Sequence, residues 1–165
     1  PIQCISVEDS LLVISCSGRF NTNPETGKQD TIPGQVQLWN TNTMSLKDIV
    51  QFTWKTTPWH IINSSINDEI FVVLSGDPLY PGSAGVACLT YGPDFLSIKW
   101  DTYSENFEAL HGIDESADGK SLFVSGRGDG HLHILNADNG KKIKSIPLGD
   151  NLSSIKPNGV SAVYK

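Results

Sequence analysis

The sequence predicts an all-β fold made of repeated four-stranded antiparallel sheets, and three observations lead to this prediction. The same order of segments recurs three times: an apolar strand, a polar turn, and a second apolar strand that ends in Ser-Gly. Each Ser-Gly pair is followed by a loop and by a third strand that opens on glycine. Helical periodicity of any length is absent, and the prolines fall in loops or at strand ends, where a missing N–H costs least.

The first two strands of each unit lie in stretches that begin at Ile2, Trp59 and Leu110. The turns between these strands are centred on three aspartates, Asp9, Asp68 and Asp118. The pairs that end the second strands are Ser17-Gly18, Ser75-Gly76 and Ser125-Gly126. A further copy opens at Pro157-Asn158-Gly159-Val160. The chain therefore repeats one hairpin three times and begins it a fourth time.

The third strands open at Gly34, Gly85 and Gly130, and the first and last of them alternate polar and apolar residues, as a half-buried strand requires. A short turn and a fourth strand complete each unit, near residues 46–53, 95–100 and 142–148. The last of these turns holds Asn139-Gly140, which suits a tight hairpin with positive φ.

Repeated units of four antiparallel strands joined by short turns are the blades of a β-propeller. We expect blades 1, 2 and 3 at about residues 2–56, 57–107 and 108–150, and the first strand of a next blade at 155–165. Propellers have 4–8 blades, so three blades and one strand cannot close a ring. We expect the segment to belong to a larger ring, completed by further sequence or by another chain. A β-sandwich or an open meander is the alternative.

Composition excludes some classes of partner. The chain has 165 residues, only 12 of them Lys or Arg, and a formal net charge of −6. Without a basic cluster it lacks the electrostatic footprint of nucleic-acid binding, so we expect no nucleic-acid partner. No stretch approaches the roughly 18 apolar residues of a membrane-spanning helix. Abundant Ser, Asn, Thr and Gly, and sequons at Asn63 and Asn151, favour an extracellular, periplasmic or cell-surface protein.

The three cysteines, Cys4, Cys16 and Cys88, are too few for a disulfide framework and lack the spacing of a zinc site. If residues 2–7 and 11–16 form a hairpin, Cys4 and Cys16 point to the same face, two residues off direct register. Two interpretations stay open for this pair, a disulfide or small buried apolar side chains, and we favour the second.

The third blade contains four motifs in a fixed order: His111-Gly112-Ile113, Ser116-Ala117-Asp118-Gly119-Lys120, Leu122-Phe123-Val124-Ser125-Gly126 and Asp138-Asn139-Gly140-Lys141. With these residues it resembles the YVTN family of bacterial and archaeal β-propeller repeats. Blades 1 and 2 match only in pattern. The resemblance implies a seven-bladed ring of the WD40/YVTN-like superfamily and an extracellular, periplasmic or surface-layer protein that binds partners. The superfamily also includes the propeller portions of redox enzymes that carry metals or haem.

The first strand of each propeller blade lines the central channel, so the residues that open it lie at the channel mouth. Gln3, His60, His111 and Asn158 align at this place and would form part of a polar ring. His60 and His111 are candidate ligands for copper, haem iron or a substrate carboxylate, since neutral imidazole is a common ligand. Two ligands are fewer than a catalytic metal needs, so we favour a polar channel lining bonded to water, with no cofactor.

A second candidate site lies on the loops between the second and third strands. The polar loop at residues 19–33 offers oxygen ligands that could hold calcium, Asn21, Asn23, Glu25 and Asp30, but without the spacing of an EF-hand. The loop at 77–84 adds Asp77 and Tyr80 on the same face. Long loops in compact repeats are where binding residues concentrate, so we expect this face to bind a protein or a glycan.

Two further motifs have structural interpretations that we favour. His131 and His133 alternate along one strand and could grip a metal, but a solvated strand face or packing between blades is the better interpretation. Arg127-Gly128-Asp129 spells an integrin-type tripeptide, yet it occupies a short connection that ends in an ordinary hairpin turn.

No motif of a catalytic nucleophile, a phosphate-binding loop or a zinc protease occurs in the chain. The first functional hypothesis is therefore a non-enzymatic, exported or surface-associated scaffold that binds a protein or glycan through its loop-rich face. The second is the propeller part of a redox enzyme with a metal or haem at the channel mouth. The third is a WD40-like intracellular assembly platform, which the absence of a Trp-Asp ending disfavours; Leu38-Trp39-Asn40 comes closest.

Overall fold

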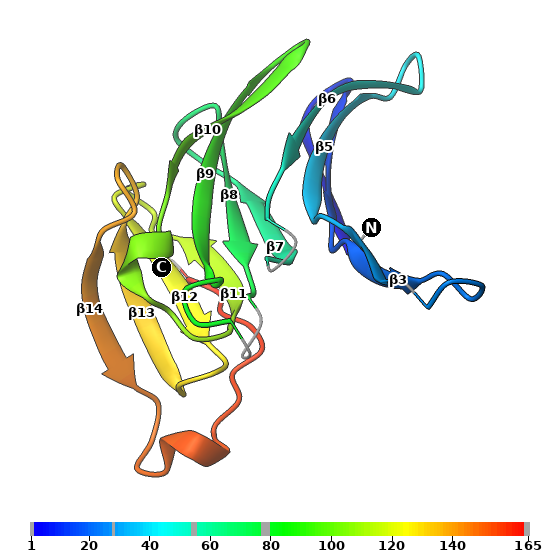
Figure 1. Ribbon diagram of the computed structural model, residues 1–165. Coiled ribbons are helices and arrows are strands. Elements are labelled where there is room, and N and C mark those ends of the chain that lie inside the picture. The colour runs from blue at the N-terminus through cyan, green and yellow to red at the C-terminus, as the bar shows by residue number, and fades with distance from the viewer. Residues whose placement is uncertain (1, 28, 54–55, 77–79, 164–165) are drawn as a thin grey trace.

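The computed structural model describes residues 2–27, 29–53, 56–76 and 80–163, and at 19–21 and 29–31 the description is limited to the backbone. It contains three four-stranded antiparallel sheets and one two-stranded hairpin. The sheets stand side by side, and the strands of each sheet follow one another in chain order (Figure 1). The all-β prediction of repeated four-stranded sheets is confirmed.

Blade 1 consists of β1 (Gln3–Glu8), β2 (Leu11–Cys16), β5 (Gln35–Asn40) and β6 (Ser45–Gln51). Blade 2 consists of β7 (Pro58–Asn63), β8 (Glu69–Leu74), β9 (Gly85–Gly92) and β10 (Phe95–Asp101). Blade 3 consists of β11 (Leu110–Glu115), β12 (Ser121–Gly126), β13 (His131–Asn136) and β14 (Lys142–Pro147). Two short 3-10 turns, η1 (Tyr103–Glu105) and η2 (Leu152–Ser154), follow blades 2 and 3.

The connection between β2 and β5 is not the irregular loop that the sequence suggested. It forms a hairpin of β3 (Arg19–Thr22) and β4 (Gln29–Ile32), which projects away from blade 1 (Figure 1). The turn closes because Asn23 Oδ1 accepts hydrogen bonds from the backbone N–H groups of Glu25 and Thr26 at 2.9 and 3.2 Å. Gly27, at a φ of 65°, donates back to the Asn23 carbonyl. These two residues supply the turn chemistry that pairs the flanking segments.

The segment 155–163, expected as the opening strand of a next blade, forms no ladder among the described residues and lies against β11. Ala162 N donates to Asp114 Oδ2 at 2.6 Å. Gly112 and Gly159 approach so closely that a Cβ on Gly112 would lie 2.6 Å from the Gly159 Cα. The segment therefore takes the place beside β11 that an inner strand would occupy, without a described strand on its other side to pair with.

Blade 2 is buried on both faces, and its second strand joins two separate cores. Ile70, Val72 and Leu74 pack in the core between blades 1 and 2. Phe71 and Val73, which alternate with them along β8, pack in the core between blades 2 and 3. Successive side chains of a strand point to opposite faces, so a strand covered on both sides needs an unbroken apolar run. The segment Ile70–Leu74 meets this requirement, and every residue of β8 is buried.

The cysteines are all free. Cys4 pairs with Ile14, so Cys16 lies two residues off direct register, as the predicted hairpin requires. The favoured interpretation of both as buried apolar side chains is wrong: Cys4 is exposed and Cys16 is only half-buried, because they sit on the face of blade 1 that no described segment covers. Cys88 is buried, and burial beside the Glu69 carboxylate raises the pKa of its thiol.

Polar side chains tie neighbouring blades together at both ends. At the turn between β7 and β8, the buried Glu115 carboxylate accepts hydrogen bonds from Ser64 Oγ at 2.8 Å and from Ser65 N and Oγ at 2.8 and 3.0 Å. These hydrogen bonds offset the cost of burying the carboxylate. Without the carboxylate, the same donors would lose this acceptor. Glu115 therefore fastens blade 3 to the turn of blade 2.

We predict that Glu115→Ala lowers the free energy of unfolding by about 2 kcal/mol, because it removes charge-assisted hydrogen bonds and leaves the buried Ser64 hydroxyl without this acceptor. Urea denaturation of the wild type and the variant measures the effect. Glu25→Ala is the matched control, since Glu25 is exposed at the tip of the β3–β4 hairpin. Equal urea midpoints for the two variants would contradict the role given to Glu115.

Candidate functional site

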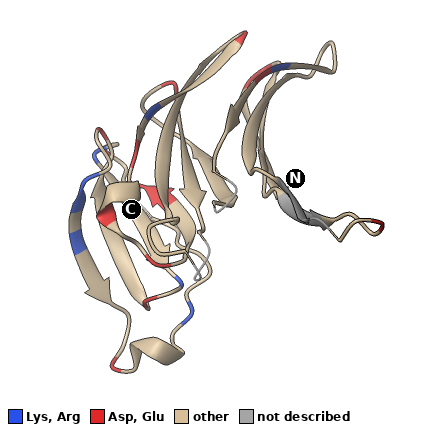
Figure 2. Ribbon diagram, viewed as in Figure 1, with Lys and Arg blue, Asp and Glu red and all other residues tan. Residues whose placement is uncertain are grey.

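The four residues predicted for the channel mouth are brought together. Gln3, His60, His111 and Asn158 line one cavity of about 290 Å³, and Ile2 and Trp59 complete its walls. The residues come from the start of β1, β7 and β11 and from the segment 155–163. The charged residues are spread over the sheets (Figure 2), and the residues that line this cavity include no Lys, Arg, Asp or Glu.

The pairing of the strands shows which of these residues occupy equivalent positions in blades 2 and 3. In β7, Pro58 and Ile61 pair with Leu74 and Val72, so the strand holds one residue more than its partner. β11 has the same bulge, because Leu110 and Ile113 pair with Gly126 and Val124. The residues inside the bulges are Trp59-His60 and His111-Gly112. His60 therefore corresponds to Gly112, and His111 corresponds to Trp59, one place away from the alignment made on the sequence.

Hydrogen bonds between the inner strands fix the side chains of this cavity. Gln3 Oε1 accepts from Ile61 N at 2.8 Å, and His60 Nδ1 accepts from Ile113 N at 3.1 Å. The two bonds are alike, since each runs from a side chain of one inner strand to the backbone N–H that directly follows the bulge of the next inner strand. His111 Nδ1 hydrogen-bonds to the Asn158 carbonyl, which can only accept. Side chains therefore link the inner strands of neighbouring blades, between which there is no backbone ladder.

These bonds also fix the tautomers of the two histidines. His60 Nδ1 accepts a backbone N–H, so the neutral ring carries its proton on Nε2. His111 Nδ1 must donate to a carbonyl, so its Nε2 bears a lone pair. Burial lowers the pKa of His60, and nearby His111 lowers it further, against a smaller opposing effect of Asp114. When both rings are in the neutral form, the cavity presents one N–H donor from His60 and one nitrogen acceptor from His111.

This donor set does not fit the metal or haem site that was considered for His60 and His111. A metal binds the lone pair of a ring nitrogen, and His60 offers none while its Nδ1 accepts the Ile113 N–H. The other polar lining residues, Gln3 and Asn158, are amides rather than the imidazole, thiolate or carboxylate groups that hold transition metals. No group of three potential metal-ligating side chains occurs among the residues that the structure describes.

Of the residues predicted to form a binding site on the loops, some belong to the β3–β4 turn and others have side chains outside the described residues. Asn23 closes the β3–β4 turn, as described above, and Glu25 is exposed beside it. Asn21 and Asp30 pair across the hairpin through their backbones, and their side chains lie outside the described residues. Asp77 also lies outside them. Asn23 Oδ1 is engaged by two N–H groups, so the calcium set proposed from the sequence has one of its oxygens already committed.

Tyr80 lies between two cavities at the same end of the sheets. The first, of about 470 Å³, runs between blades 1 and 2 and is lined by Thr53, Thr56, Tyr80 to Ser83 and Tyr103. The second, of about 570 Å³, runs between blades 2 and 3 and adds Asn106 to Ala109, Gly128 and Lys156. We call this end, with its two cavities and the β3–β4 hairpin, the connector face, because the loops and linkers between strands meet there. Tyr103 and Phe107 were missed by sequence reasoning, since they lie in the linker between blades rather than in a predicted loop.

The buried His133 and the half-buried Asp129 form a cluster that serves the packing of blade 3. His133 is 3% exposed, and its ring packs edge-on against Phe107 with centroids 4.9 Å apart. Its Nδ1 lies 2.9 Å from Ser145 Oγ, and its Nε2 lies 3.2 Å from Asp129 Oδ2. Asp129 Oδ1 also accepts from His131 N at 3.1 Å. The acid of the Arg-Gly-Asp tripeptide is thus engaged within blade 3, and His133 serves packing between blades.

Comparison finds several solved structures of similar architecture, among them the following two. A hypothetical selenium-binding protein from Sulfolobus tokodaii matches 86% of this chain with a TM-score of 0.61 at 15% identity. The β-propeller domain of Cps50 (Swd1) from Myceliophteria thermophila matches 84% with a TM-score of 0.54 at 10% identity. The chain is a β-propeller segment. The matches span 37% and 42% of the two solved chains, and at these identities they show the fold alone.

No protein-family model matches the sequence, and no curated protein sequence matches it either. The β-propeller fold thus rests on the three blades and on their likeness to these two structures. Among the described residues, no helix is long and apolar enough to cross a membrane.

The buried histidines predict how the stability of the segment depends on pH. Burial is the largest effect on His133 and lowers its pKa from the ordinary value of 6.5, despite the nearby Asp129. Well above pH 6.5 the ring is neutral in both the folded and the unfolded chain. Below it, the unfolded chain binds a proton that folded His133 resists, so the free energy of unfolding falls as the pH decreases.

We therefore expect the melting temperature to fall between pH 7.5 and pH 5, by calorimetry, and to fall less in His133→Leu. His60 contributes to the pH dependence of stability in the same direction, since its pKa is also lowered. His133→Leu combined with His60→Asn should flatten the dependence further. A pH dependence that is unchanged in His133→Leu would show that this ring does not titrate as its burial requires.

Proposed function

We propose that this β-propeller segment is a non-enzymatic binding module that captures a protein partner on its connector face. The observation that carries the proposal is that two cavities, one between blades 1 and 2 and one between blades 2 and 3, share the segment Tyr80 to Ser83. The surface is therefore hollowed in two adjoining places on the connector face.

The chemistry of the connector face supports a protein as the partner. Tyr80, Pro81, Tyr103 and Phe107 give the cavities aromatic and apolar walls, and the exposed Glu108 and Lys156 lie at their margin. Aromatic anchors surrounded by a polar rim are typical of protein-binding surfaces. Ligand pockets form preferentially where packed units meet, and both cavities lie between two blades.

An exported or cell-surface location and membership of the YVTN-type repeats belong to this proposal. Both rest on the composition, on the motifs of blade 3 and on the two sequons, whose Asn63 and Asn151 are exposed. A redox role for the channel mouth receives no support from the donor set of His60 and His111. A ring of seven blades, completed by further sequence or by another chain, remains the assembly that we propose.

The proposal predicts that changes on the connector face abolish partner capture. The immobilised protein should enrich a partner from an extract of its source cells, and Tyr80→Ala should reduce this enrichment by about tenfold or more, as loss of an aromatic anchor does. Removal of residues 21–32 should act in the same way. Mass spectrometry of the captured proteins measures the effect.

Phe95→Ala is the matched control, because Phe95 is an exposed aromatic residue on the β9–β10 turn, at the opposite end of blade 2. It should leave capture unchanged. Capture that survives both connector-face changes, or that is lost equally in Phe95→Ala, would refute the connector face as the binding surface. A partner that is lost on enzymatic removal of its sugars would show that the face binds a glycan rather than a protein.

A further inference from the structure

We propose that the cavity at the channel mouth binds a small, uncharged, polyhydroxylated ligand of about the size of one sugar ring, which lies against Trp59 and bridges His60 and His111. This site is separate from the connector-face cavities, with which it shares no lining residue. The inference does not depend on the function proposed for that face.

The first argument is the pairing of one donor with one acceptor. His60 offers the proton on Nε2, and His111 offers the lone pair on Nε2, because the other nitrogen of each ring is committed to a backbone group. A hydroxyl group both accepts and donates, so it satisfies the two rings together. Gln3 adds an amide N–H₂ group to the lining, since its Oε1 is occupied by the Ile61 N–H.

The second argument is the absence of full charge around the cavity. Its lining contains two amides, two imidazoles, Ile2 and Trp59. A carboxylate or phosphate would meet the His111 lone pair without a fixed positive charge to compensate it. Asp114, whose charge acts on His60, does not line the cavity, and its Oδ2 accepts the backbone N–H of Ala162 at 2.6 Å. A cation would meet the His60 N–H. An uncharged polar ligand avoids both conflicts.

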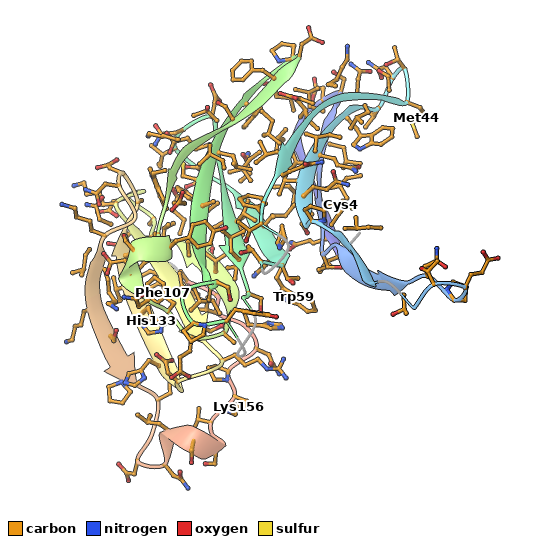
Figure 3. The ribbon with its side chains drawn as sticks, in the orientation of Figure 1. Cys4, Met44, Trp59, Phe107, His133 and Lys156 are labelled. Atoms are coloured by element: carbon orange, nitrogen blue, oxygen red, sulfur yellow. The ribbon has the colours of Figure 1, made fainter. Side chains whose placement is uncertain are left out.

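The third argument is the combination of an aromatic wall with a small volume. Figure 3 shows Trp59 at the start of β7, and its ring centroid lies 5.0 Å from that of His111, with the planes tilted by 53°. An aromatic face beside hydrogen-bonding groups accommodates the apolar C–H face of a sugar ring while its hydroxyls reach the polar wall. The cavity, at about 290 Å³, is at the lower limit of the roughly 300–1,000 Å³ typical of drug-sized ligands, which favours a single ring.

The test uses D-glucose, D-galactose and N-acetyl-D-glucosamine as separate probes, titrated into the protein and observed by saturation-transfer NMR. We expect at least one to bind. His111→Asn should weaken it about fivefold or more, because the amide can still donate to the Asn158 carbonyl but the ring acceptor is gone. His60→Asn should do the same, since its carbonyl can still accept the Ile113 N–H while the ring donor is lost.

Trp59→Leu should abolish the signal, and two controls should not alter it. Trp39→Phe changes a tryptophan of blade 1 whose Nε1 is bonded to Gln37 and which does not line the cavity. Tyr80→Ala changes the connector face alone, so it separates failure of this inference from failure of the proposed function. Comparable melting temperatures of all variants confirm that they are folded.

Three results would overturn the inference. The first is that none of the three sugars binds. The second is that a sugar binds with unchanged affinity in His60→Asn, His111→Asn and Trp59→Leu. The third is stoichiometric binding of Zn²⁺ or Cu²⁺ that is lost in His60→Asn, measured by calorimetry, because it would require the His60 lone pair that the Ile113 N–H occupies.

Discussion

The alternation of side chains along β8 is the constraint on which the arrangement of all three sheets depends. Its residues face two cores in turn, so neither core can form without the middle blade in place. Blades 1 and 3 each contribute one apolar face to a core, and their strands alternate accordingly. The fold behaves as a short linear array in which neighbours stabilise one another, and the middle unit has two neighbours.

Polar side chains also hold neighbouring blades together, in addition to the apolar cores between them. The inner strands of adjacent blades do not share a ladder, so the side chains of Gln3 and His60 accept the backbone N–H groups of the next blade. At the other end, Glu115 holds the turn of blade 2. The same bonds that fasten the blades also orient the histidines of the channel mouth, which links the packing of the fold to the chemistry available in the cavity.

The sequence was sufficient to predict the sheets, because Ser-Gly pairs, aspartate turns and glycine openings are local signals. It also placed four residues at one cavity. It could not resolve the one-residue difference between His60 and His111, since a bulge is visible only in the register with a second strand. The β3–β4 hairpin was missed although Asn23 and Gly27 mark its turn. Tyr103 and Phe107 carried no local signal, because their positions depend on how two blades meet.

The bulges at the openings of β7 and β11 have a consequence for how such a channel acquires selectivity. A regular strand turns alternate side chains away from the axis, whereas the extra residue lets two consecutive side chains, such as Trp59 and His60, line the same cavity. Blade 2 thereby contributes one aromatic and one polar side chain to the same cavity. A channel built in this way can change its chemical character by substitution at adjacent codons, without any change in the sheets that support it.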